Sequence, residues 1–214
     1  MSSTSAVAAL DAALDGMPVT TTEVGSEDLF QEGQRLYGER RYSDAAQRWE
    51  HAALLQHGPS HALLSEMLSD GRAGVGRDDK RAFELAAAGA ALGCAHSKGA
   101  LGRCYFAGRG VAEDFAKALA LGRESAAVGS CFGQYVVGCC YSFGEGVAQD
   151  QAEAARLYRL AAAQGYADAQ YTLGTMFKNS KGVAQDRAEA IRWFRLAAAH
   201  GHEFAQSSLA EMGA

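Results

Sequence analysis

The sequence predicts an all-α fold, an α-solenoid of antiparallel helix pairs, and three observations lead to this prediction. A five-residue marker, Gly-Val-x-x-Asp, returns every 36 residues, and its glycine stands at Gly74, Gly110, Gly146 and Gly182. A second glycine series keeps the same spacing, at Gly93, Gly129, Gly165 and Gly201. Between the two series, apolar residues recur at the spacing of an amphipathic helix. Two interleaved series in one register indicate stacked helical repeats.

The second helix of each unit is expected to begin at the aspartate of the marker, since Asp is a preferred N-cap. Asp150 with Glu153, and equally Asp186 with Glu189, has the spacing of a capping box. The helix should end at the second glycine, which suits a left-handed C′ position. Its predicted buried stripes are Ala154, Tyr158, Ala161 and Ala162 in one unit, and Ala190, Phe194, Ala197 and Ala198 in the next.

The first helix of each unit follows the second glycine. Ala169, Leu173 and Phe177 fall at i, i+4 and i+8, and they form its predicted core stripe. A glycine recurs inside this helix, at Gly102, Gly138 and Gly174. A mid-helix Gly costs about 1 kcal/mol relative to Ala. Its recurrence at one position therefore predicts that a neighbouring helix approaches closely there.

The full pattern is Ala-x-x-x-Leu-Gly-x-x-Tyr/Phe, then Gly-x-Gly-Val-x-x-Asp, then Ala-x-x-Trp/Tyr-x-x-x-Ala-Ala-x-x-Gly. It resembles the Sel-one-like repeat, a relative of the tetratricopeptide repeat. The resemblance covers about residues 58–214, and it implies a right-handed superhelix that serves as an adaptor or scaffold in protein complexes. The unit starting near Gly58 departs from the pattern, because Ser65 and Leu68 replace the usual Gly and Tyr, and Ala73 is inserted before Gly74.

Three parts of the chain are distinguished. Residues 1–24 are rich in Ser, Thr and Ala, and we expect a mostly disordered N-terminal tail. Residues 25–57 suit a tetratricopeptide-like helix pair, with core candidates Tyr42, Ala45, Ala46 and Trp49. Residues 58–214 hold the repeats, and the segment after Gly201 is expected to be a single first helix that caps the array.

Composition narrows the classes of partner. The formal net charge is −5, which argues against nucleic acid and against an anionic membrane surface. No apolar run approaches the roughly 18 residues of a transmembrane helix. The N-terminus lacks the basic region of a signal peptide. These observations predict a cytoplasmic location, with the nucleus also open, and they leave the oligomeric state open.

The five cysteines are an odd number, which argues against a complete set of internal disulfides. The spacing of Cys131 and Cys139 matches one found in disulfide-bonded secreted members of the family that the chain resembles. Here both fall in one predicted helix, about 12 Å apart at 1.5 Å per residue, whereas a disulfide needs Cα atoms within roughly 7 Å. Cys104 and Cys140 occupy equivalent positions and are interpreted as small buried apolar residues. We therefore expect reduced thiols.

From the sequence we expect no catalytic site, no metal site and no site for another cofactor. The histidine pairs, His57 with His61 and His200 with His202, are interrupted by glycine or proline and share no helix face. The glycine-rich turns follow no strand and precede no Gly-Lys-Ser/Thr, so they are not phosphate loops. Glu113 and Asp114 sit on an exposed turn, where no pKa shift is expected. The chain is thus not expected to be an enzyme.

The remaining candidate for a binding site is the face of each first helix that points away from its core stripe. In tetratricopeptide-type solenoids the first helices line the concave side, and aromatic residues and Arg are favoured anchors in interfaces. The alternative is that these rings pack between adjacent units. The predicted partner-binding residues are His96, Arg103, Phe106, Phe132, Tyr135, Tyr171, Thr175 and Lys178.

The sequence therefore favours a scaffold or adaptor that binds a peptide or helix of another protein on the concave face. Two alternatives stay open. Some members of the family that the chain resembles bind or hydrolyse small molecules, and a structural subunit of a larger assembly would also fit.

Overall fold

The computed structural model describes residues 24–71 and 74–214. This part of the chain contains eleven helices and no strand. The helices are α2 Ser26–Gly38, α3 Tyr42–Leu54, α4 Gly58–Asp70, α5 Asp79–Ala91, α6 Ala95–Ala107, α7 Phe115–Ala127, α8 Cys131–Phe143, α9 Gln151–Ala163, α10 Ala167–Asn179, α11 Arg187–Ala199 and α12 Ala205–Glu211. The expected tail, apart from Val24, and the inserted Ala73 lie outside the described residues.

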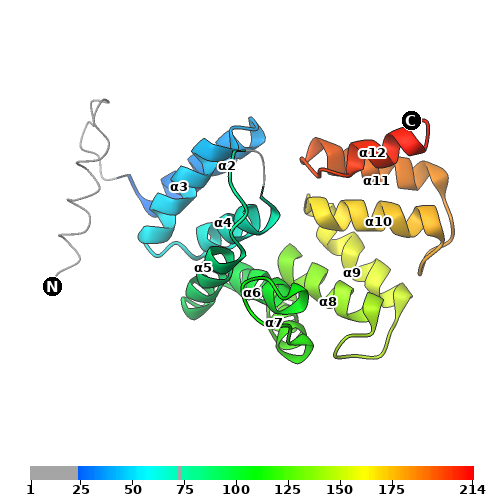
Figure 1. The fold of residues 1–214 in the computed structure, drawn as a ribbon, viewed down its shortest axis with the longest axis horizontal. Helices are drawn as coiled ribbons and strands as arrows, with labels where there is room; N and C mark the ends of the chain where they lie inside the picture. The colour runs from blue at the N-terminus through cyan, green and yellow to red at the C-terminus, as the bar shows by residue number, and fades with distance from the viewer. Residues whose placement is uncertain (1–23, 72–73) are drawn as a thin grey trace.

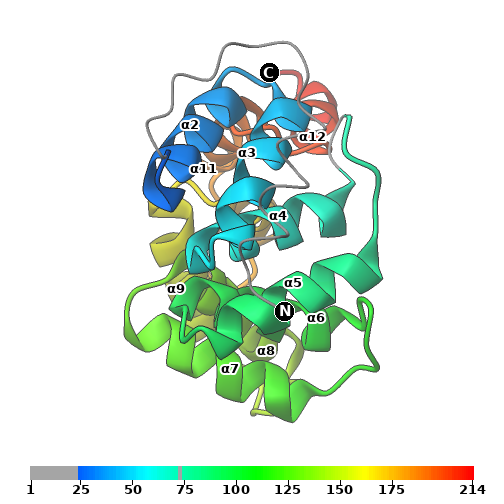
Figure 2. The ribbon, with the colours of Figure 1, turned by 90° about the vertical axis from the view of Figure 1, so that its left-hand side faces the viewer.

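Each helix packs against the next, and the pairs form one curved row. Figure 1 shows an open arc, in which α2 and α4 stand on one side of a gap and α10 to α12 on the other. In the perpendicular view, α2, α3, α11 and α12 gather at the same end of the molecule (Figure 2). The predicted all-α solenoid is confirmed, and α12 ends the row as a single helix against α11.

The N-caps of the second helices form as predicted. The Asp150 carboxylate accepts the backbone N–H groups of Ala152 and Glu153 at 3.0 and 2.9 Å. The second half of the predicted capping box is wrong, because the Glu153 carboxylate pairs with Arg156 at 2.7 Å instead. The backbone N–H of Asp150 already donates to the carbonyl of Tyr141 at 2.9 Å, so it has no need of Glu153.

The same correction applies one repeat later. Asp186 accepts the N–H groups that follow it, whereas Glu189 pairs with Arg192 at 3.2 Å. The N–H of Asp186 donates to the carbonyl of Phe177. In both repeats the end of the preceding helix thus supplies the acceptor that the sequence assigned to glutamate.

The glycines that end the second helices and the glycines inside the first helices behave as predicted. Gly165 ends α9 with a φ of 86°, in the left-handed region that favours glycine. Inside α10, a Cβ added to Gly174 would lie 2.8 Å from the ring of Phe194 on α11. That distance is too short for any side chain, so the recurrent mid-helix glycine does mark a close helix approach.

The core lies between the first and second helices. The residues of the predicted stripes that are fully buried are Ala154, Tyr158, Ala161, Ala162, Ala169, Leu173, Ala190, Phe194 and Ala197. Ala198 and Phe177 are half-buried. In the first pair, Ala45 and Trp49 are buried, and Tyr42 and Ala46 are half-buried. The assignment of residues 25–57 to the tetratricopeptide type stays a prediction.

All five cysteines are free thiols. Cys131 and Cys139 lie on the single helix α8, as predicted, and Cys104 and Cys140 are buried. Within the described ranges, no helix combines the length and the apolar character that a bilayer span needs.

Candidate functional site

The inner face of the arc is hollowed by two cavities of similar size. The first, which we call the apolar cavity, has a volume of about 590 Å³. Its walls come from both ends of the described chain and from its middle. They include Phe30, Tyr37, Trp49, Leu63, Met67, His96, Cys131, Phe132, Tyr166 and His200. Residues so far apart in sequence share one cavity because the row of helices curves back on itself.

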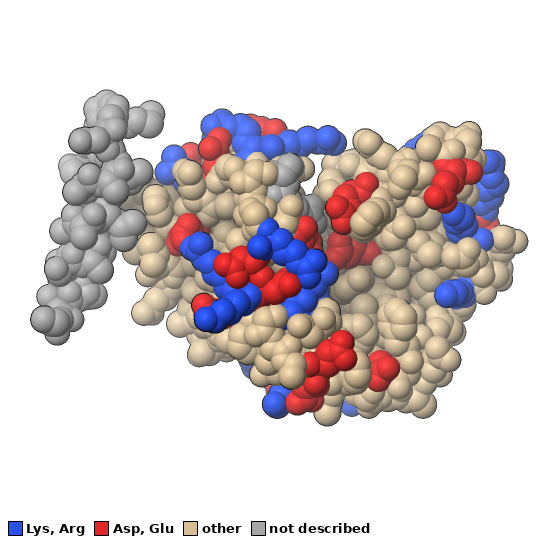
Figure 3. All heavy atoms as spheres, in the orientation of Figure 1, with Lys and Arg blue, Asp and Glu red and all other residues tan. Residues whose placement is uncertain are grey.

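The second hollow, which we call the polar cavity, has a volume of about 580 Å³. Its lining combines charged and aromatic side chains, among them Tyr42, Asp70, Arg77, Arg109, Tyr135, Asp168, Tyr171, His202 and Phe204. A small cavity of about 180 Å³ shares Arg109, Tyr135 and Asp168 with it and adds Phe106 and Phe143. In Figure 3, basic and acidic side chains intermingle near the middle of this side of the molecule, next to a hollow.

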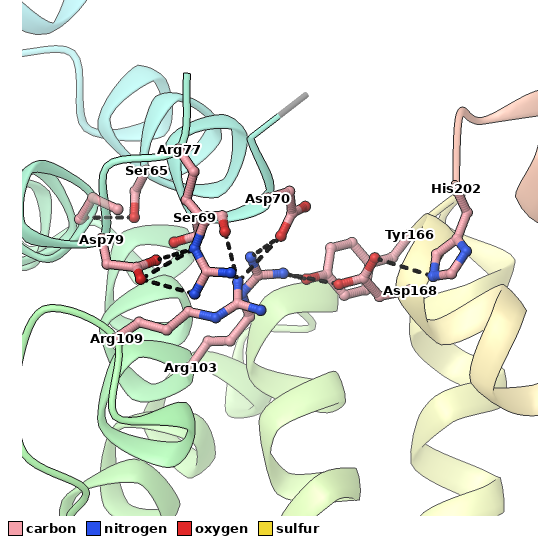
Figure 4. Close-up of polar contacts among 11 residues, drawn as sticks. Ser65, Ser69, Asp70, Arg77, Asp79, Arg103, Arg109, Tyr166, Asp168 and His202 are labelled. Atoms are coloured by element: carbon pink, nitrogen blue, oxygen red, sulfur yellow. Dashed lines mark hydrogen bonds and ion pairs between the residues drawn. The ribbon is translucent and has the colours of Figure 1, made fainter. Parts of the chain in front are cut away.

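A buried arginine crosses the inner face between these cavities. Arg103, on α6, donates from Nη2 to Asp70 at 2.6 Å and from Nη1 to Asp168 at 2.8 Å. Its Nη1 also donates to the hydroxyl of Tyr166 at 3.0 Å. Figure 4 shows the guanidinium between these partners, with Arg109 beside it. Arg109 donates to the same Asp70 carboxylate at 3.3 Å.

The surroundings of Arg103 favour its charge. Burial disfavours a charged guanidinium, but Tyr166, Asp70 and Asp168 outweigh this effect and raise the pKa of Arg103 above its ordinary value. The guanidinium is therefore charged at any physiological pH. Together with its two carboxylates it forms a network of hydrogen-bonded ion pairs.

The turn between α11 and α12 joins the same network. The His202 ring stacks on Tyr171, with ring centroids 4.1 Å apart and planes inclined by 12°. Its Nε2 lies 3.9 Å from an oxygen of Asp168. Figure 4 places His202 on the far side of Asp168 from Arg103. The C-terminal end of the solenoid thus contributes directly to the wall of the polar cavity.

Six of the eight predicted partner-binding residues line one of the three cavities. His96 and Phe132 line the apolar cavity, and Phe132 is only 4% exposed because it packs on Tyr166 with centroids 5.3 Å apart. Tyr135 and Tyr171 line the polar cavity. Arg103 and Phe106 line the small one, together with Tyr135.

The remaining two candidates line none of these three cavities. The Thr175 hydroxyl donates to the carbonyl of Tyr171 within α10 at 3.1 Å. Lys178 pairs with Glu211 of α12 at 3.0 Å. The burial of Phe132 corresponds to the packing alternative that the sequence left open, whereas Tyr135 and Tyr171 are half-buried and His96 is exposed.

Sequence reasoning missed the acidic and hydroxyl partners of Arg103. Neither Asp70 nor Tyr166 stood out, because no repeat pattern links them to α6. One signal was available at the position that directly follows the mid-helix Gly, or the Ser that replaces it in the first unit. In successive units this position holds Glu66, Arg103, Cys139 and Thr175. Two charged residues at a position that is otherwise small indicate a buried charge network.

Three ionisable side chains of this face, Cys131, Tyr135 and Tyr166, are poorly suited to acid–base chemistry. Burial raises the pKa of the Cys131 thiol to about 12, and it raises the pKa values of the Tyr135 and Tyr166 hydroxyls well above their ordinary range. These groups therefore stay protonated near neutral pH. Among the described residues, no three His, Cys, Asp or Glu side chains are placed to hold a metal ion together.

The exposed turn before α7 requires one correction. The expectation that nothing shifts a pKa there is wrong for Asp114, because the backbone N–H of Lys117 donates to its carboxylate and lowers its pKa. The shift favours the charged form, which is what an N-cap requires. It is thus a property of the helix terminus.

Comparisons with known proteins agree with the repeat pattern. The family model described as Sel1 repeat matches residues 58–94, 96–130, 132–166 and 167–202. A comparison with curated proteins finds no match.

Solved structures of similar fold come from several bacteria. The chain is similar to c5321, a protective antigen of uropathogenic Escherichia coli with an SLR fold, at 26% identity over 87% of this chain and a TM-score of 0.51. It spans only 41% of that antigen's length. A Sel1 repeat protein from Oxalobacter formigenes is 25% identical over 85% of this chain and 74% of its own, with a TM-score of 0.54.

A putative Sel1 repeat protein from Klebsiella pneumoniae has a TM-score of 0.61 and 20% identity, over 88% of this chain and 93% of its own. At that identity the likeness concerns the fold alone. The four matched segments together cover more than half of the 214 residues. The chain belongs to the Sel1 repeat family.

Proposed function

We propose that this chain is a protein-interaction scaffold or adaptor that binds a peptide or helix of a partner protein on its concave face. The observation that carries the proposal is the pair of cavities of about 590 and 580 Å³ on the inner face, walled by aromatic side chains from separate repeats. The apolar cavity has concave, largely apolar walls with a few polar groups, which are typical of ligand sites. Membership of the Sel1 repeat family supports a scaffold, since such repeats generally mediate protein interactions.

A non-catalytic role is part of the proposal. Catalytic sites gather groups whose pKa values are shifted toward the working pH. In the apolar cavity the pKa values of Cys131 and Tyr166 are shifted the other way, so neither is a ready base or nucleophile. A small-molecule or hydrolytic role, and a purely structural role, are the rival outcomes of the test below.

We assign direct contact with the partner to His96, Phe106, Tyr135 and Tyr171, which line the cavities and are not fully buried. Phe132 would serve as a wall of the apolar cavity. Contact by Thr175 and Lys178 stays a prediction from the sequence. A cytoplasmic location also belongs to the proposal, and it is supported by five free thiols, which suit a reducing compartment.

The test uses the tagged full chain, affinity capture and mass spectrometry, with Tyr171→Ala as the probe. Its matched control is Tyr105→Ala, because Tyr105 is also a half-buried tyrosine with an aromatic neighbour, yet it lines none of the three cavities. Anchor residues in interfaces lose about 2 kcal/mol or more on truncation, which is roughly a 30-fold loss of affinity. We expect Tyr171→Ala to lose a captured protein that the wild type and Tyr105→Ala retain.

Thermal unfolding of the free variants is measured alongside. A normal melting temperature with lost capture supports the proposed groove. Equal capture by both variants, at a temperature where both are folded, would show that the partner binds elsewhere. Capture of copies of this chain alone, with self-association in light scattering, would favour the structural subunit. Turnover of a small substrate by the wild type would revive the hydrolytic alternative.

A further inference from the structure

The Arg103 network extends beyond adjacent repeats. Arg103 lies on α6, Asp70 at the end of α4, and Asp168 at the start of α10. Helix α8 stands between α6 and α10 in the sequence of first helices. One side chain therefore spans the inner face from α4 to α10, across a sequence separation of 98 residues between its two carboxylate partners.

A link of this kind is unusual in a solenoid. Each repeat contacts only its neighbours, so the curvature of the row results from small rotations added over successive interfaces. No single interface fixes the distance between the two ends. A contact that skips one repeat can fix it, because any straightening of the row would pull Asp168 away from Arg103.

The pairs are also well shielded from water. The side chains of Arg103, Asp70 and Asp168 are only 10%, 19% and 20% exposed. Salt and competing water weaken surface ion pairs, but they affect buried pairs much less. Two different nitrogens of the planar guanidinium hold the two carboxylates, a geometry that Lys cannot supply.

We propose that Arg103 is a positioning residue that sets the curvature of the solenoid, and with it the width of the groove between α4 and α10. Its role is then to hold the two walls of the groove at a fixed separation in the free protein. This role does not depend on the proposed partner binding, and it replaces the direct contact predicted for Arg103 from the sequence.

The experiment compares the small-angle X-ray scattering of the full chain with that of three variants. Arg103→Met removes the link but leaves Asp70 and Asp168 without their shared cation. The triple variant Asp70→Asn, Arg103→Met, Asp168→Asn removes the link together with the two carboxylate charges. Arg195→Met is the matched control, since Arg195 is exposed on α11 and has no role in the network.

Breaking a buried ion pair from one side should lower the melting temperature of Arg103→Met by about 6–20 °C. The triple variant should regain part of this loss, because it also removes the two buried carboxylate charges that Arg103 neutralises. Both variants should nevertheless have a larger radius of gyration than the wild type. We expect an increase on the order of 1 Å, against about 17 Å for a compact chain of this length.

If Arg103→Met does not fold, the radius of gyration of the triple variant still tests the role of Arg103. An expanded triple variant with wild-type helicity supports a role in curvature, since stability alone would not move the radius. A triple variant with the wild-type scattering curve would overturn the inference. So would an equal expansion in Arg195→Met.

Discussion

At the residue scale, Cys94 differs from the other cysteines in its acidity. Its thiol is half-buried before the first residue of α6. Burial opposes the thiolate, but hydrogen bonds with His96 and Ser97 outweigh this effect and lower the pKa of Cys94 to about 7. By contrast, burial raises the pKa values of Cys131 and Cys139 to about 12.

We therefore predict that iodoacetamide alkylates Cys94 first. The rate should rise with pH and reach half of its maximum near pH 7, because the thiolate is the reactive form. Peptide mass spectrometry at pH 6, 7 and 8 measures this rate for each cysteine. Cys94→Ser should remove the fast phase. Alkylation of Cys131 at a comparable rate in the folded protein would contradict the assignment.

Leu173 tests the helix face that the sequence assigned to the core. Its side chain is 0% exposed, so Leu173→Ala should lower the free energy of unfolding by about 2–5 kcal/mol. Lys178→Ala on the same helix should cost less than about 1 kcal/mol, since its pair with Glu211 is a surface ion pair. Urea denaturation of both variants gives the two values. Equal values would mean that the wrong face of α10 was taken as buried.

At the scale of the element, two substitutions at the start of α9 distinguish a simple Asp150 N-cap from a reciprocal capping box with Glu153. Asp150 accepts two backbone N–H groups, so Asp150→Ala should lower the free energy of unfolding by about 1 kcal/mol. Glu153→Ala should have an effect of about 0.5 kcal/mol or less, because Glu153 only pairs with Arg156 at the surface. Denaturant unfolding with amide exchange at the start of α9 measures both. Comparable losses would restore the reciprocal capping box.

At the scale of the whole molecule, stability should be independent of disulfides. All five thiols are free, and Cys131 and Cys139 share one helix. Dithiothreitol should therefore change the melting temperature by no more than about 2 °C, which corresponds to less than about 1 kcal/mol for a domain of this size. Thermal unfolding followed by circular dichroism, with and without the reductant, makes the comparison. A larger decrease would reveal a disulfide that stabilises the fold.

Much of the fold was predictable because its causes are local. The Asp N-caps, the left-handed glycines and the Ala/Leu/aromatic stripes each depend on residues within one helix pair. The recurrence of glycine at the Gly174 position correctly predicted a close helix approach, and the structure shows that Phe194 of α11 makes it. The predicted capping box was wrong because its cause is not local to one helix. The acceptor for the Asp150 N–H is the Tyr141 carbonyl at the end of the preceding helix.

The candidate site was less predictable. The sequence identified Tyr135 and Tyr171 as facing away from the core, and the structure places both in the wall of the polar cavity. It did not distinguish the buried Phe132 from them. One helix determines the direction in which a side chain points, but burial also depends on the neighbour that it meets, which for Phe132 is Tyr166, directly before α10.

The sequence by itself thus determined the repeat length, the helix pairs and the residues that hold each pair together. The tertiary structure alone decided that α2 and the end of α11 share one cavity, and that Arg103 meets both Asp70 and Asp168. The physical reason is that small rotations accumulate along the row of repeats. Each repeat interface adds a small rotation that no local pattern records, and only their sum over several repeats determines which distant side chains meet across the groove.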